Sequence, residues 1–140
     1  MTRSSNDETI RDVLTTTRRI ALVGASNKPN RPSYGVMQFL LAHGYEVTPV
    51  NPGLAGQTIL DQTVVATLEE AAPLDMVDLF RNAAEVEAPV NDAIRLGAKT
   101  VWMQLGVINE AAADAARTAG LKVIMDHCPA IEFPRLKIKK

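Results

Sequence analysis

The sequence contains one cysteine, few aromatic residues and no long apolar run. The lone cysteine, Cys128, excludes an internal disulfide bond and suits a reducing compartment. No apolar run approaches the roughly 20 residues that cross a bilayer, and residues 1–10 lack the apolar core of a signal peptide. These absences predict a soluble, cytoplasmic protein with no membrane partner.

An excess of positive charge is also absent. The chain has 15 Lys and Arg residues against 16 Asp and Glu residues, for a formal net charge of −1. Because proteins that bind the nucleic-acid backbone usually carry a clear basic excess, no nucleic-acid partner is expected. The histidines, the cysteine and the carboxylates nowhere have the spacing of metal ligands, so no metal site is expected either.

Apolar segments alternate with amphipathic ones along the whole chain. We expect strands at residues 20–23, 45–50, 75–80, 99–103 and 121–125, with short extended pieces at 58–60 and 63–65. Helices are expected at residues 5–17, 34–43, 68–72, 83–87, 89–96 and 110–118, with a break near Glu87 caused by Pro89. The strands are continuously apolar, as in a parallel sheet that helices bury on both faces. The predicted fold is α/β, a Rossmann-like, doubly wound three-layer sandwich with a mainly parallel sheet.

Helix starts are predicted from side chains that can accept a hydrogen bond from a free backbone N–H group. Ser5 matches a capping box with the glutamate three residues later, and Ser33, Asn82 and Asn109 each precede an amphipathic segment. We expect residues 1–18 to form a helix that packs on the domain. The domain itself is predicted to span residues 19–136, followed by a basic tail at residues 137–140.

Residues 19–35, RIALVGASNKPNRPSYG, combine a strand, a small-residue turn, a basic loop and the start of a helix. The small side chains after Gly24 allow an anion to reach backbone N–H groups, and Lys28 and Arg31 add positive charge. The segment matches neither the G-x-G-x-x-G nor the Walker pattern. On spacing alone, an ordinary strand-to-helix connection with a solvated loop remains an alternative.

The predicted sheet brings together the loop segments that are least typical of structural elements. Parallel strands share one carboxyl-end rim, and ligands of such folds bind in the crevice on that rim. The segments at residues 24–28, 51–53, 80–82, 104–107 and 126–129 all follow predicted strands. This convergence predicts a binding site at the rim and favours that interpretation over an ordinary strand-to-helix connection with a solvated loop.

The residues at the second strand end narrow the choice of ligand. A domain that binds NAD carries an Asp or Glu there, roughly 20 residues after the glycine turn, to accept from the ribose diol. Here the position is Asn51. Together with Lys28, Arg31 and Arg81 near the cleft, this absence favours an adenine nucleotide with an extra ribose phosphate. Coenzyme A and NADP both fit that description.

Five stretches carry a resemblance to a known family: GAS-x-K-x-x-R-x-S, GYEVTPVNP, DMVDLFR, TVWMQLGV and VIMDHCPAIEFPRL. Together they resemble the small stand-alone coenzyme A-binding proteins, which are similar in fold to the nucleotide-binding domain of the succinyl-CoA synthetase α-subunit. The match covers residues 19–136. The resemblance implies that coenzyme A is the ligand.

The resemblance also implies roles for particular residues. Residues 25–28 would hold the phosphates, residues 51 and 52 would flank the nucleotide, and residues 80–82 would line the path of the pyrophosphate and pantetheine. Leu54 stands where the synthetase has a lysine, so Arg31 or Arg81 is the candidate for the missing charge. The synthetase's second domain, with its phosphorylated histidine, has no counterpart here, so no ligase activity is expected.

The leading hypothesis is therefore a protein that binds coenzyme A or an acyl-CoA without catalysis, as a sensor or carrier. The alternatives are an NADP-dependent oxidoreductase, another nucleotide-binding protein, or an interaction protein with an empty cleft. His127 beside Cys128 suggests a Cys–His pair, but adjacent side chains at a strand end point apart. Cys128 near the pantetheine end is instead a hypothetical site for a mixed disulfide with coenzyme A. The predicted cofactor-binding residues are Gly24, Ala25, Ser26, Asn27, Lys28, Arg31, Ser33, Asn51, Pro52, Phe80, Arg81, Asn82, Gln104, Gly106 and Cys128.

Overall fold

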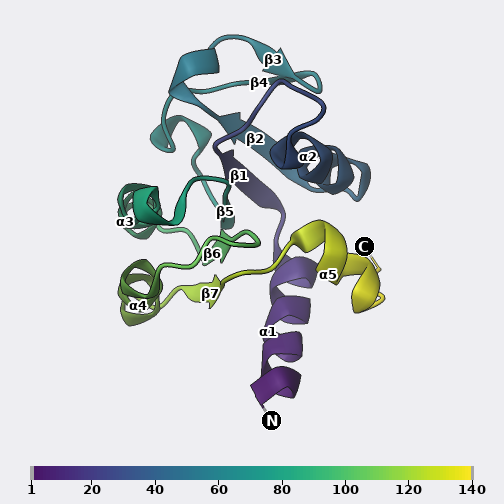
Figure 1. Cartoon of the computed structure of the whole chain (residues 1–140), viewed down its shortest axis with the longest axis vertical. Coiled ribbons are helices and arrows are strands. Elements are labelled where there is room, and N and C mark those ends of the chain that lie inside the picture. The colour runs from purple at the N-terminus through teal and green to yellow at the C-terminus, as the bar shows by residue number, and fades with distance from the viewer. Residues whose placement is uncertain (1, 140) are drawn as a thin grey trace.

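The computed structural model describes residues 2–139, and the side chains from Asn6 onward. The helices are α1 (Thr2–Thr16), α2 (Pro32–Ala42), α3 (Glu87–Arg95), α4 (Glu110–Thr118) and α5 (Pro129–Arg135). The strands are β1 (Arg19–Val23), β2 (Glu46–Val50), β3 (Thr58–Ile59), β4 (Gln62–Thr63), β5 (Met76–Leu79), β6 (Thr100–Met103) and β7 (Lys122–Ile124) (Figure 1). Short 3-10 turns occupy Pro52–Leu54, Glu69–Ala71 and Ala83–Glu85.

Five strands form a parallel sheet in the order β2-β1-β5-β6-β7. The chain moves outward from β1 to β2 and then returns to the other side of β1 with β5. The direction of winding therefore reverses between β1 and β5, where this class of sheet opens its crevice. Beyond β2, a single parallel bridge between Val50 and Val65 extends the edge, and β3 and β4 pair as a separate antiparallel hairpin.

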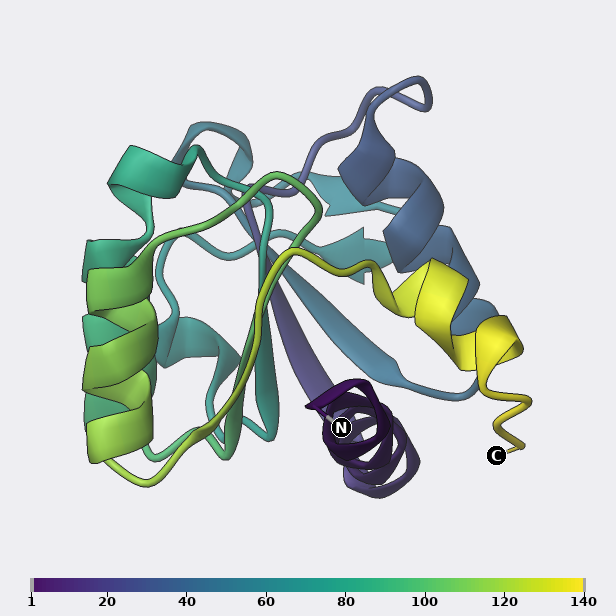
Figure 2. The ribbon, with the colours of Figure 1, turned by 60° about the horizontal axis from the view of Figure 1, so that its bottom comes forward.

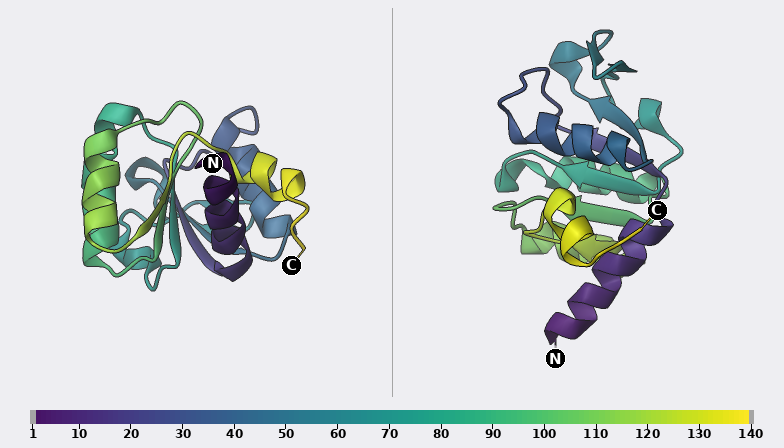
Figure 3. Two further views of the ribbon diagram at one scale, coloured as in Figure 1. Left: turned by 90° about the horizontal axis from the view of Figure 1, so that it is seen from below. Right: turned by 90° about the vertical axis from the view of Figure 1, so that its right-hand side faces the viewer.

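Helices cover both faces of the sheet, as the sequence predicts. Figure 2 shows α1, α2 and α5 on one side and α3 and α4 on the other, and Figure 3 (left) shows the same layers from below. Alternate residues of a strand face opposite sides, so Met76 belongs to the core under α1, α2 and α5, and Val77 belongs to the core under α3 and α4. The predicted doubly wound, Rossmann-like three-layer fold is confirmed.

Helix α1 packs on the same face as α5. Its apolar residues Ile10, Val13 and Leu14 are buried against the domain, and the opposite side of the helix is exposed and strongly polar. The Arg11 guanidinium donates to the carbonyl of Leu136 at 2.9 Å, which joins the first helix to the end of the last. Beyond α5, within the predicted basic tail, the side chain of Ile138 is buried in the same core. Figure 3 (right) shows the two helices side by side.

Three predicted helix starts are wrong. Helix α1 begins at Thr2, so Ser5 lies inside it rather than at its start. Helix α2 begins at Pro32, and Ser33 is buried in its first turn, because a proline at the first position supplies the required φ angle. Asn82 makes no capping hydrogen bond, and only a 3-10 turn follows it before α3.

Other elements differ in extent from the predictions. Asn109 is the predicted cap of α4, and its Oδ1 accepts from the Ala112 N–H at 3.0 Å. The helix predicted at residues 68–72 is a single 3-10 turn. Helix α5 was not predicted, because its two prolines, Pro129 and Pro134, indicate a turn. In the structure Pro129 begins the helix and Pro134 lies in its last turn.

Candidate functional site

A cleft of about 500 Å³ lies at the carboxyl ends of β1, β2 and β5. Its lining residues are Gly24, Ala25, Ser26, Asn27, Lys28, Arg31, Pro32, Ser33, Asn51, Gly53, Leu54 and Phe80. A larger open groove of about 1010 Å³ lies at the opposite, amino ends of the strands, between α1, α2 and α5. Because ligands of parallel α/β sheets bind at the carboxyl ends, the smaller cleft is the candidate site.

Gly24 makes the turn that opens the cleft. Its φ is +87°, and a β-carbon at this position would lie 2.7 Å from the carbonyl oxygen of Phe80. Only glycine adopts this conformation and allows so close an approach. The Phe80 N–H donates in turn to the carbonyl of Val23 at 2.8 Å. The ends of β1 and β5 are thus joined at the point where the winding reverses.

The loop after Gly24 presents hydrogen-bond donors to the cleft. Among the described residues, the backbone N–H groups of Ser26 and Asn27 have no acceptor. The Ser26 hydroxyl oxygen accepts from the Lys28 N–H at 3.1 Å, which leaves the hydroxyl proton free to donate outward. The amino-terminal end of α2 follows directly. Free N–H groups beside a helix amino terminus form an anion-binding site.

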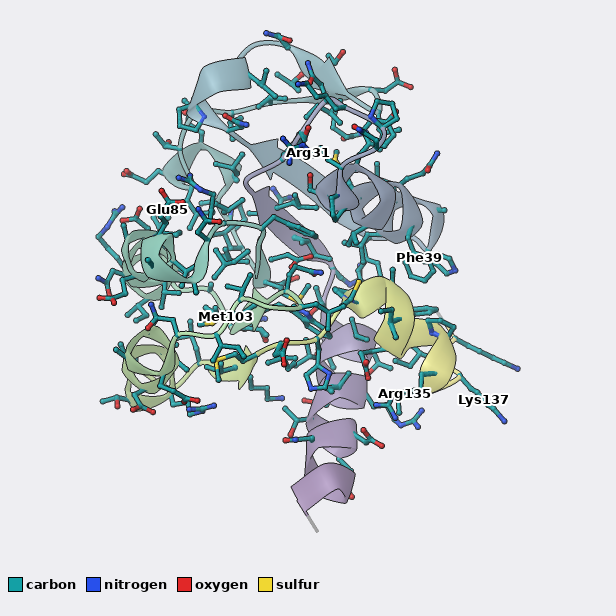
Figure 4. The ribbon with its side chains drawn as sticks, in the orientation of Figure 1. Arg31, Phe39, Glu85, Met103, Arg135 and Lys137 are labelled. Carbon is teal, nitrogen blue, oxygen red and sulfur yellow. The ribbon has the colours of Figure 1, made fainter. Side chains whose placement is uncertain are left out.

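Positive charge surrounds these donors. Lys28 and Arg31 are exposed, and neither has a carboxylate partner in the part of the chain that the structure describes. No aspartate or glutamate is among the described lining residues. Figure 4 shows Arg31 at the loop that precedes α2. The two cations therefore favour an anionic ligand without competition from a neighbouring carboxylate.

Asn51 joins the loops after β1 and β2. Its Nδ2 donates to the carbonyl of Ala25 at 2.8 Å, and its Oδ1 accepts from the Gly53 N–H at 2.9 Å. The amide oxygen is thus engaged within the protein and does not replace the acid that accepts from the ribose diol in NAD-binding domains. Asn51 instead fixes one wall of the cleft.

Some predicted site residues lie beside the cleft without lining it. Pro52 begins the 3-10 turn next to it. Arg81 and Asn82 are exposed, and the Arg81 guanidinium lies 3.6 Å from the Glu85 carboxylate. Three lining residues are not among the predicted cofactor-binding residues, namely Pro32, Leu54 and Gly53, the last of which lies in the predicted rim segment 51–53. Each is adjacent in sequence to a predicted residue or loop, which is the signal that could have found them.

The predicted residues on β6 and β7 form a separate part of the rim. Gln104 and Cys128 are buried, and the Gly106 N–H donates to Oδ1 of Asp126 at 2.7 Å. This bond ties together the loops after β6 and β7. The His127 Nδ1 lies 3.5 Å from Oε2 of Glu132, so the partner of this ring nitrogen is Glu132 and not its neighbour Cys128.

Neither a metal-ligand cluster nor a membrane-spanning helix is found within residues 2–139. No group of three or more His, Cys, Asp or Glu residues there could hold a metal ion. No helix there is both long and apolar enough to cross a membrane.

A sequence model described as a CoA-binding domain matches residues 18–134. This chain belongs to the CoA-binding domain family. The resemblance to the stand-alone coenzyme A-binding proteins that the motifs indicate is therefore confirmed. The family match ends within α5 and begins at the residue before β1, so it includes every strand of the sheet and every loop of the cleft.

Relatives of this CoA-binding domain are of similar length. The uncharacterized protein YneT of Bacillus subtilis (strain 168) is 34% identical over 120 residues, which cover 85% of this chain and 87% of YneT. The crystal structure of Prb, a PH1109 protein redesigned for binding, has 40% identity and a TM-score of 0.90, with 96% of this chain and 94% of Prb covered. A cell-free protein, ID.343 from Thermus thermophilus, has 32% identity and a TM-score of 0.88, with 93% and 98% covered.

Proposed function

We propose that the cleft binds coenzyme A or an acyl-CoA through its phosphate groups. The observation that carries this proposal is the pairing of free N–H donors at Ser26 and Asn27 with the unpaired cations Lys28 and Arg31. Hydrogen bonds from charged donors to phosphate are about twice as strong as neutral ones. Membership of the CoA-binding domain family supports coenzyme A as the source of that phosphate.

The proposed role is binding without catalysis, as a sensor or carrier of coenzyme A. The described lining residues include no Asp, Glu, His or Cys, which are side chains that commonly serve as general bases or nucleophiles. Its hydroxyl and amide groups suit recognition.

Isothermal titration calorimetry of the purified protein tests the proposal. Coenzyme A, dephospho-coenzyme A and NADP are titrated under the same conditions into the protein and its Lys28→Glu variant. We expect coenzyme A to bind, dephospho-coenzyme A to bind more weakly, and Lys28→Glu to weaken coenzyme A binding about 10- to 100-fold. A lost charged hydrogen bond of about 1.5–3 kcal/mol corresponds to that range.

Lys137→Glu is the matched control, because it makes the same change of charge at an exposed lysine outside the cleft. Figure 4 shows Lys137 far from Arg31. Equal losses in the two variants would indicate a general charge effect and contradict a site at Lys28. Binding of NADP alone would favour an oxidoreductase. Release of free thiol from acetyl-CoA by the protein would contradict the non-catalytic role.

A further inference from the structure

Asp78 is a fully buried acid in the middle of the sheet. It lies in β5 between Leu22 of β1 and Trp102 of β6, with 0% of its surface exposed. Because residues alternate along a strand, it faces the same side as Met76, under α1, α2 and α5. Neither of its carboxyl oxygens has a hydrogen-bond partner among the described residues. The proposed function gives this acid no role.

The other buried oxygen without a partner in the described chain belongs to the side chain of Gln104. The Gln104 N–H donates to the carbonyl of Leu79 at 3.4 Å, so Gln104 continues β6 opposite Phe80. It therefore faces the same side of the sheet as Asp78, one strand away and two positions further along. With neighbouring parallel strands about 4.8 Å apart and a rise of about 3.3 Å per residue, such diagonal neighbours have their backbones roughly 8 Å apart, within reach of a long side chain. Figure 4 marks Met103, which directly precedes Gln104.

The neighbourhood holds three acceptor oxygens, and no donor among the described residues forms a hydrogen bond with them. The Trp102 indole N–H, which is opposite Asp78, donates to the carbonyl of His127 at 2.9 Å. Leu22, on the other side, has no donor in its side chain. A buried polar atom without a hydrogen-bond partner destabilises the folded state. A carboxylic acid in its protonated form supplies the missing donor.

Burial raises the pKa of the Asp78 carboxyl well above its usual range. Among the described residues beside it on the sheet no cation opposes the effect, because Leu22, Met76 and Trp102 carry no charge. The uncharged form is therefore favoured, and a neutral buried acid can act as a hydrogen-bond donor.

We propose that Asp78 is a positioning residue: its protonated carboxyl donates to Oε1 of Gln104 and turns the Gln104 amide NH₂ toward the rim, as a contact for the pantetheine arm of coenzyme A. Among the described residues the Nε2 atom of Gln104 has no hydrogen-bond partner, and unlike Oε1 it is not closed off from solvent. Phe80 lines the cleft, and Gln104 lies beside it on the next strand. An arm that leaves the cleft past Phe80 meets this NH₂ group, which donates to a pantetheine amide carbonyl. The inference rests on the proposed function, because the cleft must hold the nucleotide end.

Two substitutions at Asp78 distinguish the effect of the hydrogen-bond donor from the effect of side-chain size. Asp78→Leu replaces the donor with an apolar side chain of similar size, whereas Asp78→Asn keeps a neutral group with an N–H donor. The probes are coenzyme A and adenosine 3′,5′-bisphosphate, which lacks the pantetheine arm. Asp78→Leu is expected to weaken coenzyme A binding about 10-fold and leave bisphosphate binding within about twofold. Asp78→Asn is expected to restore coenzyme A binding to within about threefold.

Gln104→Leu is expected to cause the same loss as Asp78→Leu, and the double variant no further loss, because both act through one contact. Equal weakening of both probes by Asp78→Leu, or an Asn variant as weak as the Leu variant, would overturn the inference. A wild-type protein that binds the bisphosphate but gains nothing from the arm would overturn it and leave the phosphate site intact. Failure of both probes would contradict the proposed function itself.

One readout needs no ligand. The ¹³C chemical shift of the Asp78 carboxyl is expected to be that of a protonated acid at about pH 7, where an ordinary Asp with a pKa of about 3.9 is ionised. Asp78→Leu is also expected to shift the side-chain NH₂ resonances of Gln104. A carboxylate shift for Asp78 in the folded protein would contradict the donor role.

Discussion

At the scale of single residues, the site depends on backbone positions more than on reactive side chains. Gly24 lets the first loop approach the end of β5, and Asn51 binds two backbone groups of neighbouring loops. Both residues determine the form of the cleft, and the charged Lys28 and Arg31 supply its attraction for anions. The form of the cleft therefore depends on Gly24, which has no side chain, and on Asn51, whose side-chain amide is hydrogen-bonded within the protein.

Gly24→Ala is expected to destabilise the fold by about 2 kcal/mol and to weaken coenzyme A binding, because a β-carbon at φ +87° is strained and would collide with the Phe80 carbonyl. Urea denaturation measures the change in unfolding free energy. Gly35→Ala is the control, since Gly35 is exposed within α2 with nothing within 4 Å of the added carbon. The control should be neutral or stabilising by up to about 1 kcal/mol. Equal effects in the two variants would mean that the close approach at Gly24 is unimportant.

At the scale of elements, the strands were easier to predict than the helix starts. Apolar runs such as those of β1 and β6 are continuous and end at turn residues, so their positions agree with the prediction within about one residue. A cap depends on the local backbone angle as well as on the side chain. Asn109 has the extended backbone of a cap and makes the bond, whereas Asn82 does not make it. The residue type alone could not separate the two.

Asn109→Ala is expected to lower the unfolding free energy by about 1–2 kcal/mol, because it removes the cap of α4 and the 2.9 Å bond from Nδ2 to the carbonyl of Ala83. Asn82→Ala is the matched control, and its effect should stay within about 0.5 kcal/mol. Both variants are compared by chemical denaturation with circular dichroism. A loss at Asn82 as large as at Asn109 would show that the first of these asparagines is also a cap in solution.

At the scale of the whole molecule, the order of the strands and the contacts between distant residues could not be predicted from the sequence. The parallel sheet and its carboxyl-end rim follow from the alternation of elements. The order of the strands does not, and it is this order that places β5 against β1 and confines the cleft to three strands. The contact of Gly24 with Phe80 and the lack of a partner for Asp78 depend on residues more than 50 positions apart or on neighbouring strands. No local pattern encodes them.

The packing of α1 extends the core beyond the residues that match the family. Leu14 is fully buried, and its carbonyl accepts from the Tyr45 hydroxyl. Arg135 of α5 also pairs with Asp7 of α1 at 2.6 Å. Helix α1 is therefore part of the folded body that supports the α1, α2 and α5 face of the sheet.

Leu14→Ala is expected to cost about 2–5 kcal/mol, the usual range for a leucine truncated in a close-packed core. Glu8→Ala, at an exposed position of the same helix, is the control and should change stability by less than about 0.5 kcal/mol. Thermal and urea unfolding of both variants measure the difference. If Leu14→Ala unfolded like the wild type, α1 would not contribute to the stability of the domain.

The hydrogen bonds of Asn51 have a consequence for the rate of ligand binding. They hold the loops after β1 and β2 in place without a ligand, so the conformational entropy of these loops is lost when the chain folds. A molecule that enters the cleft does not wait for a loop to order. Under the proposed function, we therefore expect the association rate to be set by diffusion and by the field of Lys28 and Arg31, and differences in affinity among ligands to arise in the rate of dissociation.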